Sequence, residues 1–244
     1  MDLSDRQEHI LTLLREERYL SVERLSALTY TSPSSIRRDL THLQQLRLIR
    51  RTHGGASVLN EVDQAAPLRN RMTKNVVGKR AIAKKAAALL RDGMTVMLDG
   101  STTAGFLVPY IAKHKRITLF TNNMLTALEA INFGIDTHCL GGSTVDRSAV
   151  LTGPIGYASA AKIHSDICFF SSHSLDVNGI ISDPTEEENH IRTLMLENTE
   201  QRIFLCDHEK FDRRSLYTLT TLDQVDAAVL DEPWDELKSG CPII

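Results

Sequence analysis

Two arginines and several hydroxyl side chains stand at helical spacing near the start of the chain. In residues 32–43, Ile36, Leu40 and Leu43 recur as the buried stripe of a helix does. The other side of this helix would carry Ser32, Ser34, Ser35, Arg37, Arg38 and Thr41. Arginine can form paired hydrogen bonds with guanine in the major groove, and hydroxyls can donate to phosphates and base edges. The segment therefore predicts a DNA recognition helix, for which an ordinary solvated helix face is the alternative.

The residues around this segment have the layout of a winged helix-turn-helix. Ser32 can cap a helix, and Pro33 suits the first helical position because its missing N–H is not needed there. Two amphipathic segments precede this helix, one over residues 4–17 and one after Ser21. Downstream, residues 48–56 are apolar, then basic, then glycine-rich, which suits a two-stranded wing that grips phosphate or enters the minor groove. The wing residues predicted to contact DNA are Arg50, Arg51 and His53, and a plain basic hairpin is the alternative.

Length and charge limit the partners of the chain. The 244 residues are enough for about two domains, and 42% of them are hydrophobic, so a sizeable core can form. A net charge of −3 and an isoelectric point near 6.3 argue against binding nucleic acid or membrane through overall charge. Residues 32–57 nevertheless carry five arginines and a single acid. A local basic surface is therefore expected to meet an anionic partner.

Cysteine and histidine usage favours a reduced protein without a structural metal. Cys139, Cys168 and Cys206 lie in apolar runs, where cysteine is a small core residue, and Cys241 is far from them. The sequence has no CxxC or HExxH motif, and its nine histidines are scattered. No apolar run reaches membrane-spanning length, and the polar N-terminal residues are unlike a signal peptide. We expect a cytoplasmic protein with no metal site.

Short apolar segments alternate with helical segments in the second part of the chain. Strands are expected at residues 95–98, 117–120, 135–140, 166–170, 202–206 and 227–230. A helix over residues 79–91, ending at Asp92-Gly93, precedes the first of them. This alternation predicts an α/β fold with a mostly parallel sheet that helices cover on both faces. The expected domains are residues 1–57 for DNA binding and 76–244 for the α/β fold, with residues 58–75 as a linker.

Three loops that follow these strands are rich in hydroxyl and amide groups. Ligands of open α/β sheets bind at the carboxyl ends of the strands. The loop residues are Asp99, Gly100, Ser101, Thr102 and Thr103, then Thr121, Asn122 and Asn123, and then Gly141 and Gly142. Free backbone N–H groups and hydroxyls suit a phosphate, whereas the anionic Asp99 suits sugar hydroxyls. Ordinary helix capping would require the same residue types, and it remains the alternative.

These motifs resemble those of the DeoR family of bacterial transcriptional regulators. Residues 35–40 read SIRRDL and residues 48–56 read LIRRTHGGA, which is similar to the N-terminal signature of that family. The loop after Asp99 is similar to the family's Asp-Ser-Gly-Thr-Thr loop, with glycine and serine in reverse order. Residues 207–211, DHEKF, match a further landmark, and Arg192 falls where many members carry lysine.

The resemblance implies a function as well as a fold. It implies a winged helix-turn-helix followed by a sugar-phosphate-sensing domain that is similar to ribose-5-phosphate isomerase-like folds. It also implies that Lys210 faces the pocket as a cation for phosphate. The expected protein is a transcriptional regulator, in particular a repressor of carbohydrate-catabolism genes, whose binding to operator DNA is modulated by a phosphorylated sugar and which uses no cofactor. Because one small helix-turn-helix buries little surface on DNA, a homo-oligomer is expected.

Two other classes of function compete with a regulator. A sugar-phosphate isomerase-like enzyme needs a carboxylate base and a group that stabilises the enediolate. The candidates are Asp176, Asp183, Glu186, Glu187, Glu188 and Lys162. The isomerases carry a lysine-glycine-glycine-glycine segment beside their acids, and residues 166–195 contain none, which favours the regulator. A DNA-associated scaffold without a ligand would have an apolar or plugged pocket.

Overall fold

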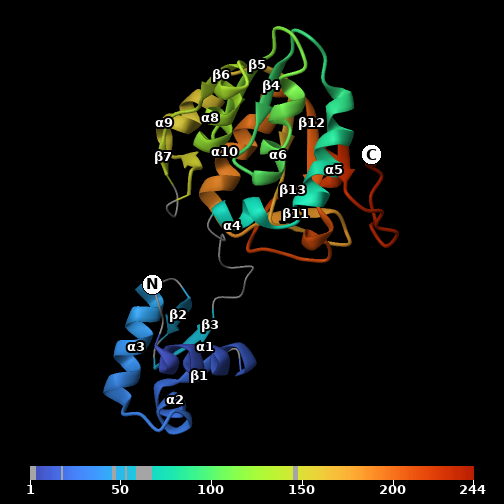
Figure 1. The fold of residues 1–244 in the computed structure, drawn as a ribbon. Coiled ribbons are helices and arrows are strands. Elements are labelled where there is room, and N and C mark those ends of the chain that lie inside the picture. The colour runs from blue at the N-terminus through green and yellow to red at the C-terminus, as the bar shows by residue number, and fades with distance from the viewer. Residues whose placement is uncertain (1–3, 18, 46–47, 53, 59–67, 145–147) are drawn as a thin grey trace. The chain divides into compact units, whose positions relative to one another are not determined.

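The chain forms two compact units, residues 1–64 and 65–244. The computed structural model describes residues 4–17, 19–45, 48–52, 54–58, 68–144 and 148–244 (Figure 1). Each unit has its own hydrophobic core.

The first unit is a three-helix winged helix-turn-helix. Its elements are α1 (Asp5–Glu17), β1 (Tyr19–Ser21), α2 (Val22–Leu28), α3 (Pro33–Gln45), β2 (Ile49–Thr52) and β3 (Gly55–Val58). Helix α3 begins at Pro33, as its sequence predicts, and β2 and β3 pair antiparallel to form the wing. Strand β1, which the sequence did not predict, pairs with β3 and completes the sheet β1-β3-β2. Three residues with one buried side chain, Leu20, are too short to show a strand pattern.

One apolar side of α3 holds the first unit together. Ile36, Leu40 and Leu43 are completely buried, together with Leu14 of α1 and Leu25 of α2. The spacing of these residues along α3 turns them all toward the other two helices. The opposite side of α3 is therefore left for solvent or a partner.

The second unit is built on a six-stranded parallel sheet in the order β14-β12-β9-β4-β5-β6. The strands are β4 (Thr95–Leu98), β5 (Thr118–Thr121), β6 (Asp136–Cys139), β9 (Ser165–Phe170), β12 (Thr199–Cys206) and β14 (Ala227–Leu230). The helices are α4 (Leu68–Thr73), α5 (Val76–Ala86), α6 (Thr102–Gly105), α7 (Val108–Ile111), α8 (Met124–Asn132), α9 (Pro154–Ala160) and α10 (Glu186–Glu197), with short 3₁₀ helices η1 (Ala87–Leu89), η2 (His208–Lys210) and η3 (Leu222–Gln224). These findings confirm the predicted fold class.

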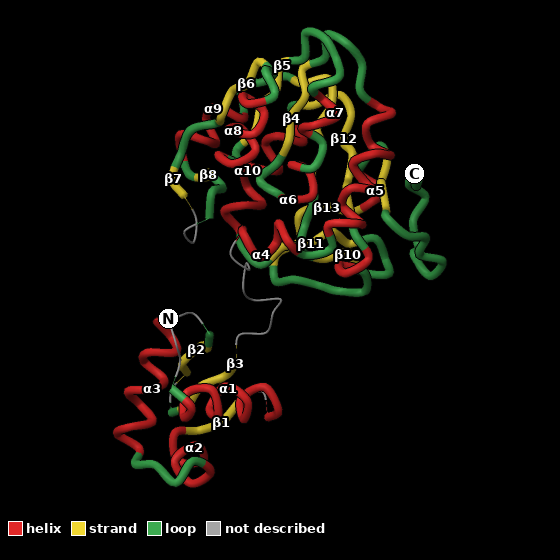
Figure 2. The backbone as a smooth tube through the Cα atoms, viewed as in Figure 1, coloured by secondary structure: helices red, strands yellow, loops and turns green. Residues whose placement is uncertain are grey.

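Helices cover both faces of this sheet, as Figures 1 and 2 show. Along β4, Val96 and Leu98 belong to one apolar cluster and Met97 belongs to the other, because successive side chains of a strand point to opposite faces. The first cluster includes Ile82 of α5, and the second includes Ile191 of α10. Two smaller antiparallel sheets adjoin this core. They are β10 (Ser174–Leu175), β11 (Ile180–Asp183) and β13 (Tyr217–Thr221) in one, and β7 (Ser143–Thr144) and β8 (Leu151–Thr152) in the other.

Three local expectations differ from the structure. Part of the expected linker over residues 58–75 is helical and forms α4. The side chain of Lys79 stabilises the end of this segment, because it donates to the carbonyl oxygens of Arg71 and Lys74. The helix expected to reach residue 91 stops earlier, because Leu90 has an extended backbone. Cys139 is exposed instead of lying in a core, since β6 is an edge strand with few covered side chains, whereas Cys168 and Cys206 are buried.

The apolar side of α3 gives a test of the first unit. Leu40→Ala should lower the free energy of unfolding of this unit by about 2–5 kcal/mol, because it leaves a cavity at a completely buried site. Hydrogen exchange of α1 and α3 measures this unit separately from the second one. Leu216→Ala, at an exposed position of the second unit, is the control and should leave exchange in both helices unchanged. A loss below 1 kcal/mol would contradict the assignment of Leu40 to the core.

Candidate ligand pocket and nucleic-acid interface

The loops predicted to bind a ligand lie at the carboxyl edge of the parallel sheet. Residues 99–103 follow β4, residues 121–123 end and follow β5, and Gly141 and Gly142 follow β6. The first two loops touch, because Asn123 Nδ2 donates to the carbonyl oxygen of Gly100 over 3.0 Å. The two glycines instead pack closely on Ile155 of α9 and Thr152 of β8, where a Cβ atom on Gly141 or Gly142 would clash. Lys210 follows β12 in η2 and points to the loop after β4.

Many polar atoms of these loops already have structural partners. Ser101 Oγ accepts from the backbone N–H of Ala104 over 3.1 Å and caps α6. Asn123 Oδ1 accepts from the backbone N–H groups of Leu125 and Thr126 and caps α8. Thr121 Oγ1 accepts from the backbone N–H of Asn123. In this conformation Ser101 and Asn123 act as helix caps, and Thr121 supports the turn before the second cap.

A buried arginine joins three carboxylates beside the loop after β4. Arg192 Nε donates to Asp99 Oδ2 over 2.9 Å, and its Nη1 donates to Asp183 Oδ2 over 2.8 Å. Arg192 Nη2 lies 3.8 Å from Glu188 Oε2, and Nη1 also reaches Asn189 Oδ1 at 3.2 Å. All of these side chains are buried. The sequence marked Arg192 only as a departure from the family pattern and did not reveal this network.

The electrostatics of this network favour the charged forms of Arg192 and Asp183. Burial alone would lower the pKa of Arg192, but the carboxylates of Asp183 and Asp99 outweigh it, so that its pKa lies above the ordinary value. Burial alone would raise the pKa of Asp183, but Arg192 and the hydrogen bonds from His173 outweigh it, and its pKa lies below the ordinary value. The Asp99 carboxylate is therefore engaged by Arg192, and it also accepts from the backbone N–H of Ser101.

The space beside Asp99 and Arg192 is small in this conformation. The pocket lined by Asp99, Asn122, Val150 and Arg192 among others is too narrow to hold a water molecule. The segment with Val150 closes it, because the backbone N–H of Leu151 donates to Asn122 O over 2.7 Å and Asn122 Nδ2 donates back to Leu151 O. The Oδ1 atom of Asn122 is buried and has no hydrogen-bond partner in the described part of the chain. Gly100 is required here, since a Cβ atom on it would lie 2.6 Å from Val150 Cγ1.

A cationic group lies at the other end of the same loop. Lys210 Nζ donates to Ser171 Oγ over 2.8 Å and to Thr103 Oγ1 over 3.2 Å, and it pairs with Asp207 at 3.2 Å. Lys79 of α5 is also buried. Burial, together with the positive charge of Lys210, lowers the pKa of Lys79 to about 8. The two lysines are therefore near enough to interact electrostatically, while Lys79 Nζ itself donates to the carbonyl oxygens of Arg71 and Lys74.

One feature of the sequence indicates that Lys79 is a candidate functional residue. Lys79 stands three, four and seven positions before Ile82, Ala83 and Ala86, all on the buried side of α5. A lysine on an apolar stripe must find partners for its charge, and such positions are unusual. Ser171 gave no such signal, because its place beside Lys210 depends on the pairing of β9 with β12.

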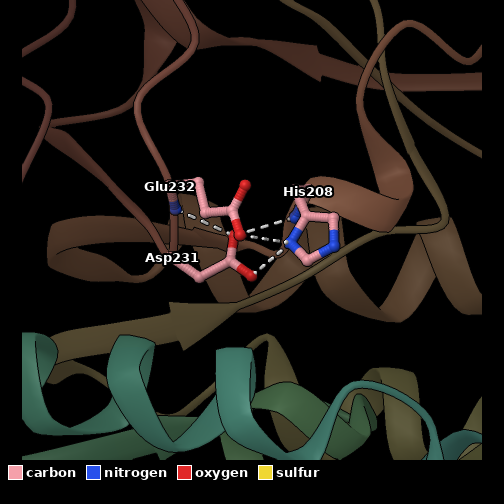
Figure 3. Close-up of side chains that lie close together, drawn as sticks. All are labelled: His208, Asp231 and Glu232. Atoms are coloured by element: carbon pink, nitrogen blue, oxygen red, sulfur yellow. Dashed lines mark hydrogen bonds and ion pairs between the residues drawn. The ribbon is translucent and has the colours of Figure 1, made fainter.

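Figure 3 shows His208, Asp231 and Glu232, whose ligand atoms lie within 4.8 Å of one another. Asp231 Oδ1 accepts from the backbone N–H groups of His208 and Glu232, and Oδ2 accepts from Asn75 Nδ2. His208 Nδ1 lies 2.8 Å from Asp231 Oδ2, and this hydrogen bond raises the pKa of His208. The carboxylate of Asp231 is thus occupied by hydrogen bonds that hold η2, the end of β14 and Asn75 of the α4–α5 turn together.

The predicted DNA-binding residues lie on the solvent side of α3 and on the wing. Ser32, Ser34, Arg37, Arg38 and Thr41 are exposed, and Ser35 is partly buried. Arg51 Nη1 donates to Thr41 Oγ1 over 3.1 Å, so the wing and α3 form one surface. Arg50 lies in β2, and His53 lies outside the described residues. The single acid of this segment, Asp39, is buried against Arg6 of α1 at 2.7 Å, which leaves the exposed face of α3 cationic.

The Arg192 network gives a test of the second unit. Arg192→Met should lower its free energy of unfolding by about 3–5 kcal/mol at pH 7, because Asp99 and Asp183 remain buried without a counter-charge. The pKa of Asp183 is lowered in the folded protein, so its stabilising effect is complete above pH ~4 and is lost as the pH falls further. In the variant, these carboxyl groups have no cation, so they should take up protons as the pH falls toward 4. The difference in free energy of unfolding between the wild type and the variant should then become smaller.

Urea unfolding at several pH values measures this deficit. The control is Arg202→Met, because Arg202 is partly exposed and its partner Asp226 lies 3.9 Å away. This control should change the free energy of unfolding by at most about 1 kcal/mol. A deficit for Arg192→Met that is small or independent of pH would show that the network does not support the fold as described.

Comparison with known proteins agrees with this architecture. Residues 6–62 match the DeoR-like helix-turn-helix domain, and residues 74–232 match the DeoR C terminal sensor domain. A structure of ribose 5-phosphate isomerase A from Methanocaldococcus jannaschii has 15% sequence identity and a TM-score of 0.43, covering 57% of this chain and 55% of that chain. This likeness is too weak to support any conclusion on function. None of the described helices is long and apolar enough to cross a membrane.

Similar proteins of known type are transcriptional regulators. The regulator GolR of Listeria innocua serovar 6a is 31% identical over 93% of this chain and 90% of its own length. The transcriptional repressor AccR of Agrobacterium fabrum is 31% identical, with 93% and 89% covered. A putative aga operon transcriptional repressor of Escherichia coli O157:H7 is 30% identical, with 99% and 93% covered. The chain therefore belongs to the DeoR family of DNA-binding transcriptional regulators.

Proposed function

We propose that this regulator is a repressor of carbohydrate-catabolism genes whose binding to operator DNA is modulated by a phosphorylated sugar. The observation that carries this proposal is the pair of cations, Lys79 and Lys210, beside the hydroxyls of Thr103 and Ser171. The names of similar proteins, among them a putative aga operon transcriptional repressor and a glycerol-3-phosphate regulon repressor, agree with it.

The phosphate group of the effector would bind between the two lysines. Burial is the main cause of the low pKa of Lys79, and the positive charge of Lys210 adds to it, so the two ammonium groups repel each other. A phosphate dianion would relieve this repulsion and would accept hydrogen bonds from the hydroxyls of Thr103 and Ser171. Thr102 adds a third hydroxyl at the edge of the same loop.

The sugar part of the effector would lie toward Asp99, Asn122 and the segment that contains Val150. The space there has almost no free volume in this conformation, whereas ligand pockets hold roughly 300–1,000 Å³. We therefore propose that binding moves this segment away from Asn122, whose buried Oδ1 could then accept from a sugar hydroxyl. Because the effector binds the open arrangement better, it shifts the population toward that arrangement.

The proposed phosphate site is linked to α4, the first described helix after the residues that join the two units. Lys79 donates to the carbonyl oxygen of Arg71 in α4 and to that of Lys74 just after the helix, and Thr102 Oγ1 lies 3.5 Å from Arg71 O. Asn75, which caps α5, donates to Asp231, and Asp231 holds His208 only two residues before Lys210. An anion bound between Lys79 and Lys210 would act on the hydrogen bonds from Lys79 to the end of α4. It would also act on the hydrogen bonds that join Asn75, Asp231 and His208. This linkage offers a route from the effector to the DNA-binding unit.

The site favours a regulator over an enzyme. Asp183 and Glu188 are committed to Arg192, and Asp176 Oδ1 accepts from two backbone N–H groups of its own turn. The other candidates for catalysis are exposed: Glu186 and Glu187 lie in the first turn of α10, and Lys162 follows α9. A general base must instead reach the proton of a bound substrate. We therefore propose that the protein is not an enzyme and uses no cofactor.

A ligand-free scaffold is the remaining alternative. The small space beside Asp99 agrees with the plugged pocket that a scaffold would have. The buried Lys79 beside Lys210 favours a ligand-binding protein, because two neighbouring cations destabilise an empty pocket and serve an anion. We further propose that the protein acts in the cytoplasm and binds DNA as a homo-oligomer.

The DNA-binding surface can be tested with one arginine. Arg37→Ala should weaken specific binding by about 1–3 kcal/mol if Arg37 contacts a base edge, because a paired hydrogen bond is lost. The measurement is fluorescence anisotropy at fixed salt, on a duplex selected from a random pool. Arg91→Ala, at an exposed position of the second unit, is the control and should bind as the wild type does. Unchanged affinity of the Arg37 variant would remove this residue from the interface.

The effector site can be tested through the pH dependence of binding. Lys79→Met and Lys210→Met should each weaken binding of a sugar phosphate at least tenfold, as measured by calorimetry with a panel of sugar phosphates and the free sugars. In the wild type, affinity should fall as the pH rises from 7 to 9, because Lys79 loses its proton near pH 8 while the phosphate stays dianionic. Lys79→Met should remove this dependence.

The matched control is Lys84→Met, which changes an exposed lysine of the same helix. It should bind the sugar phosphate as the wild type does, with the same loss of affinity above pH 8. Equal binding of a free sugar and its phosphate by the wild type would contradict the proposed phosphate site. Binding of the sugar phosphate with no change in DNA affinity would instead contradict the proposed regulation.

A further inference from the structure

One side of α8 is apolar and exposed. Met124, Leu125, Leu128 and Ile131 have exposed fractions of 41%, 39%, 57% and 58%, and Phe133 directly after the helix has 50%. Their spacing places Leu128 and Ile131 one and two turns after Met124 and Leu125, so they form a continuous stripe. The opposite side of α8, with Ala127 and Ala130, is buried. We call the exposed stripe the α8 face.

A groove lies beside the α8 face. It encloses about 680 Å³ between α8 and the α6–α7 segment, with Met72 of α4 and Arg80 of α5 at its border. Its walls include Phe106, Pro109, Tyr110, Leu125 and Leu128. Contiguous exposed apolar surface of this kind marks an interaction site, whereas single exposed apolar residues do not.

The groove carries charges of both signs that form no ion pair within the described part of the chain. Glu129 is the only charged residue of α8, and it forms no ion pair with any residue in the described part of the chain. Partial burial raises its pKa, as expected for a carboxylate that has lost water without gaining a cation. Across the groove stand Arg80, which is exposed, and Lys113, whose Nζ lies 4.9 Å from the centre of the Tyr110 ring. The groove therefore contains an anion that needs a cation and two cations that can supply it.

We propose that the α8 face and its groove form the interface between two copies of this chain. In a twofold interface each contact occurs twice, so Glu129 of one protomer would meet Lys113 and Arg80 of its partner, and the reverse. A second copy fits this surface because the groove is complementary to itself in charge and offers apolar surface to both partners. A partner of one charge sign would leave either Glu129 or the two cations unpaired.

The edges of the sheet agree with this placement. At β14, the chain covers its own edge, because Ile244 N–H donates to Ala228 O and Leu230 N–H donates to Ile244 O. At the other edge, β6 pairs only with β5 among the described strands, and α8 packs beside it. The open edge and the α8 face thus lie in one region of the unit. This inference rests on the homo-oligomer proposed above and assigns the surface that forms it.

The first test removes the apolar contact. Leu128→Glu places a charge in the α8 face at an exposed position, so the chain can still fold while the interface loses its centre. Light scattering on the full chain should show the mass of the assembly reduced to half that of the wild type. The control is Ile155→Glu, at a position of α9 with an exposed fraction of 68%, which should keep the wild-type mass.

The second test uses charge reversal in two separate chains. Glu129→Lys brings like charges together at both twofold contacts, and so does a chain with Arg80→Glu and Lys113→Glu. Each chain alone should associate at least tenfold more weakly than the wild type. An equal mixture should recover the wild-type mass, because every lysine at position 129 then meets glutamates at positions 80 and 113. Recovery on mixing also shows that both chains are folded.

The results separate this proposal from the proposed function. A wild-type chain that is monomeric, a Leu128→Glu chain with unchanged mass, or a mixture that does not recover would each overturn the α8 interface. Binding of a sugar phosphate is read separately by calorimetry on the same variants. A regulator that fails to bind any sugar phosphate but follows the mixing result would refute the effector and leave the interface supported.

Discussion

The buried charge of Arg192 is the constraint on which the second unit depends. A guanidinium that has lost its water must be surrounded by carboxylates, and a carboxylate buried beside it is equally dependent on the arginine. Arg192 comes from α10, Asp99 from the end of β4 and Asp183 from the end of β11. The pairing therefore fixes one helix, the main sheet and the small antiparallel sheet in a single arrangement. Loss of Arg192 would leave the buried carboxyl groups of Asp99 and Asp183 without the cation that pairs with both.

The same network divides the carboxyl edge of the sheet into two electrostatic regions. Around Arg192 the carboxylates outnumber the single guanidinium, so this region has little attraction for a phosphate. Around Lys210 the balance is reversed, because Lys79 adds a second buried ammonium and Asp207 supplies one carboxylate. The loop from Asp99 to Thr103 joins the two regions. A molecule with hydroxyls at one end and a phosphate at the other has the polarity of this loop.

The sequence was sufficient for the parts of the fold that depend on local patterns. The spacing of Ile36, Leu40 and Leu43 and the Ser32-Pro33 start predicted α3, and the apolar runs predicted the strands of the parallel sheet. The buried partners of Asp99 were beyond the sequence, because Arg192 is far along the chain and reaches Asp99 only after α10 packs on the sheet. The small sheets and α4 have too few residues for a periodic signal.

The role of the loop residues also depends on tertiary contacts. Ser, Thr and Asn after a strand are equally suited to capping a helix and to binding a ligand, and sequence does not separate the two. The structure shows Ser101 and Asn123 as caps, while Thr103 turns its hydroxyl to Lys210. The difference arises from Lys210, which is more than a hundred residues away in sequence and reaches the loop through the pairing of β12 with β9.

Asn123 connects the ligand loops to the α8 face. Its Oδ1 accepts from two backbone N–H groups at the start of α8, and its Nδ2 donates to Gly100 O in the loop after β4. Its neighbour Asn122 is bound in turn by Leu151. Because one side chain fixes both the loop and the helix, a change in the loop must either break these hydrogen bonds or shift α8. A surface that joins two copies through α8 would then have different contacts in the two arrangements of the pocket. Asn123 would in this way couple effector binding to assembly.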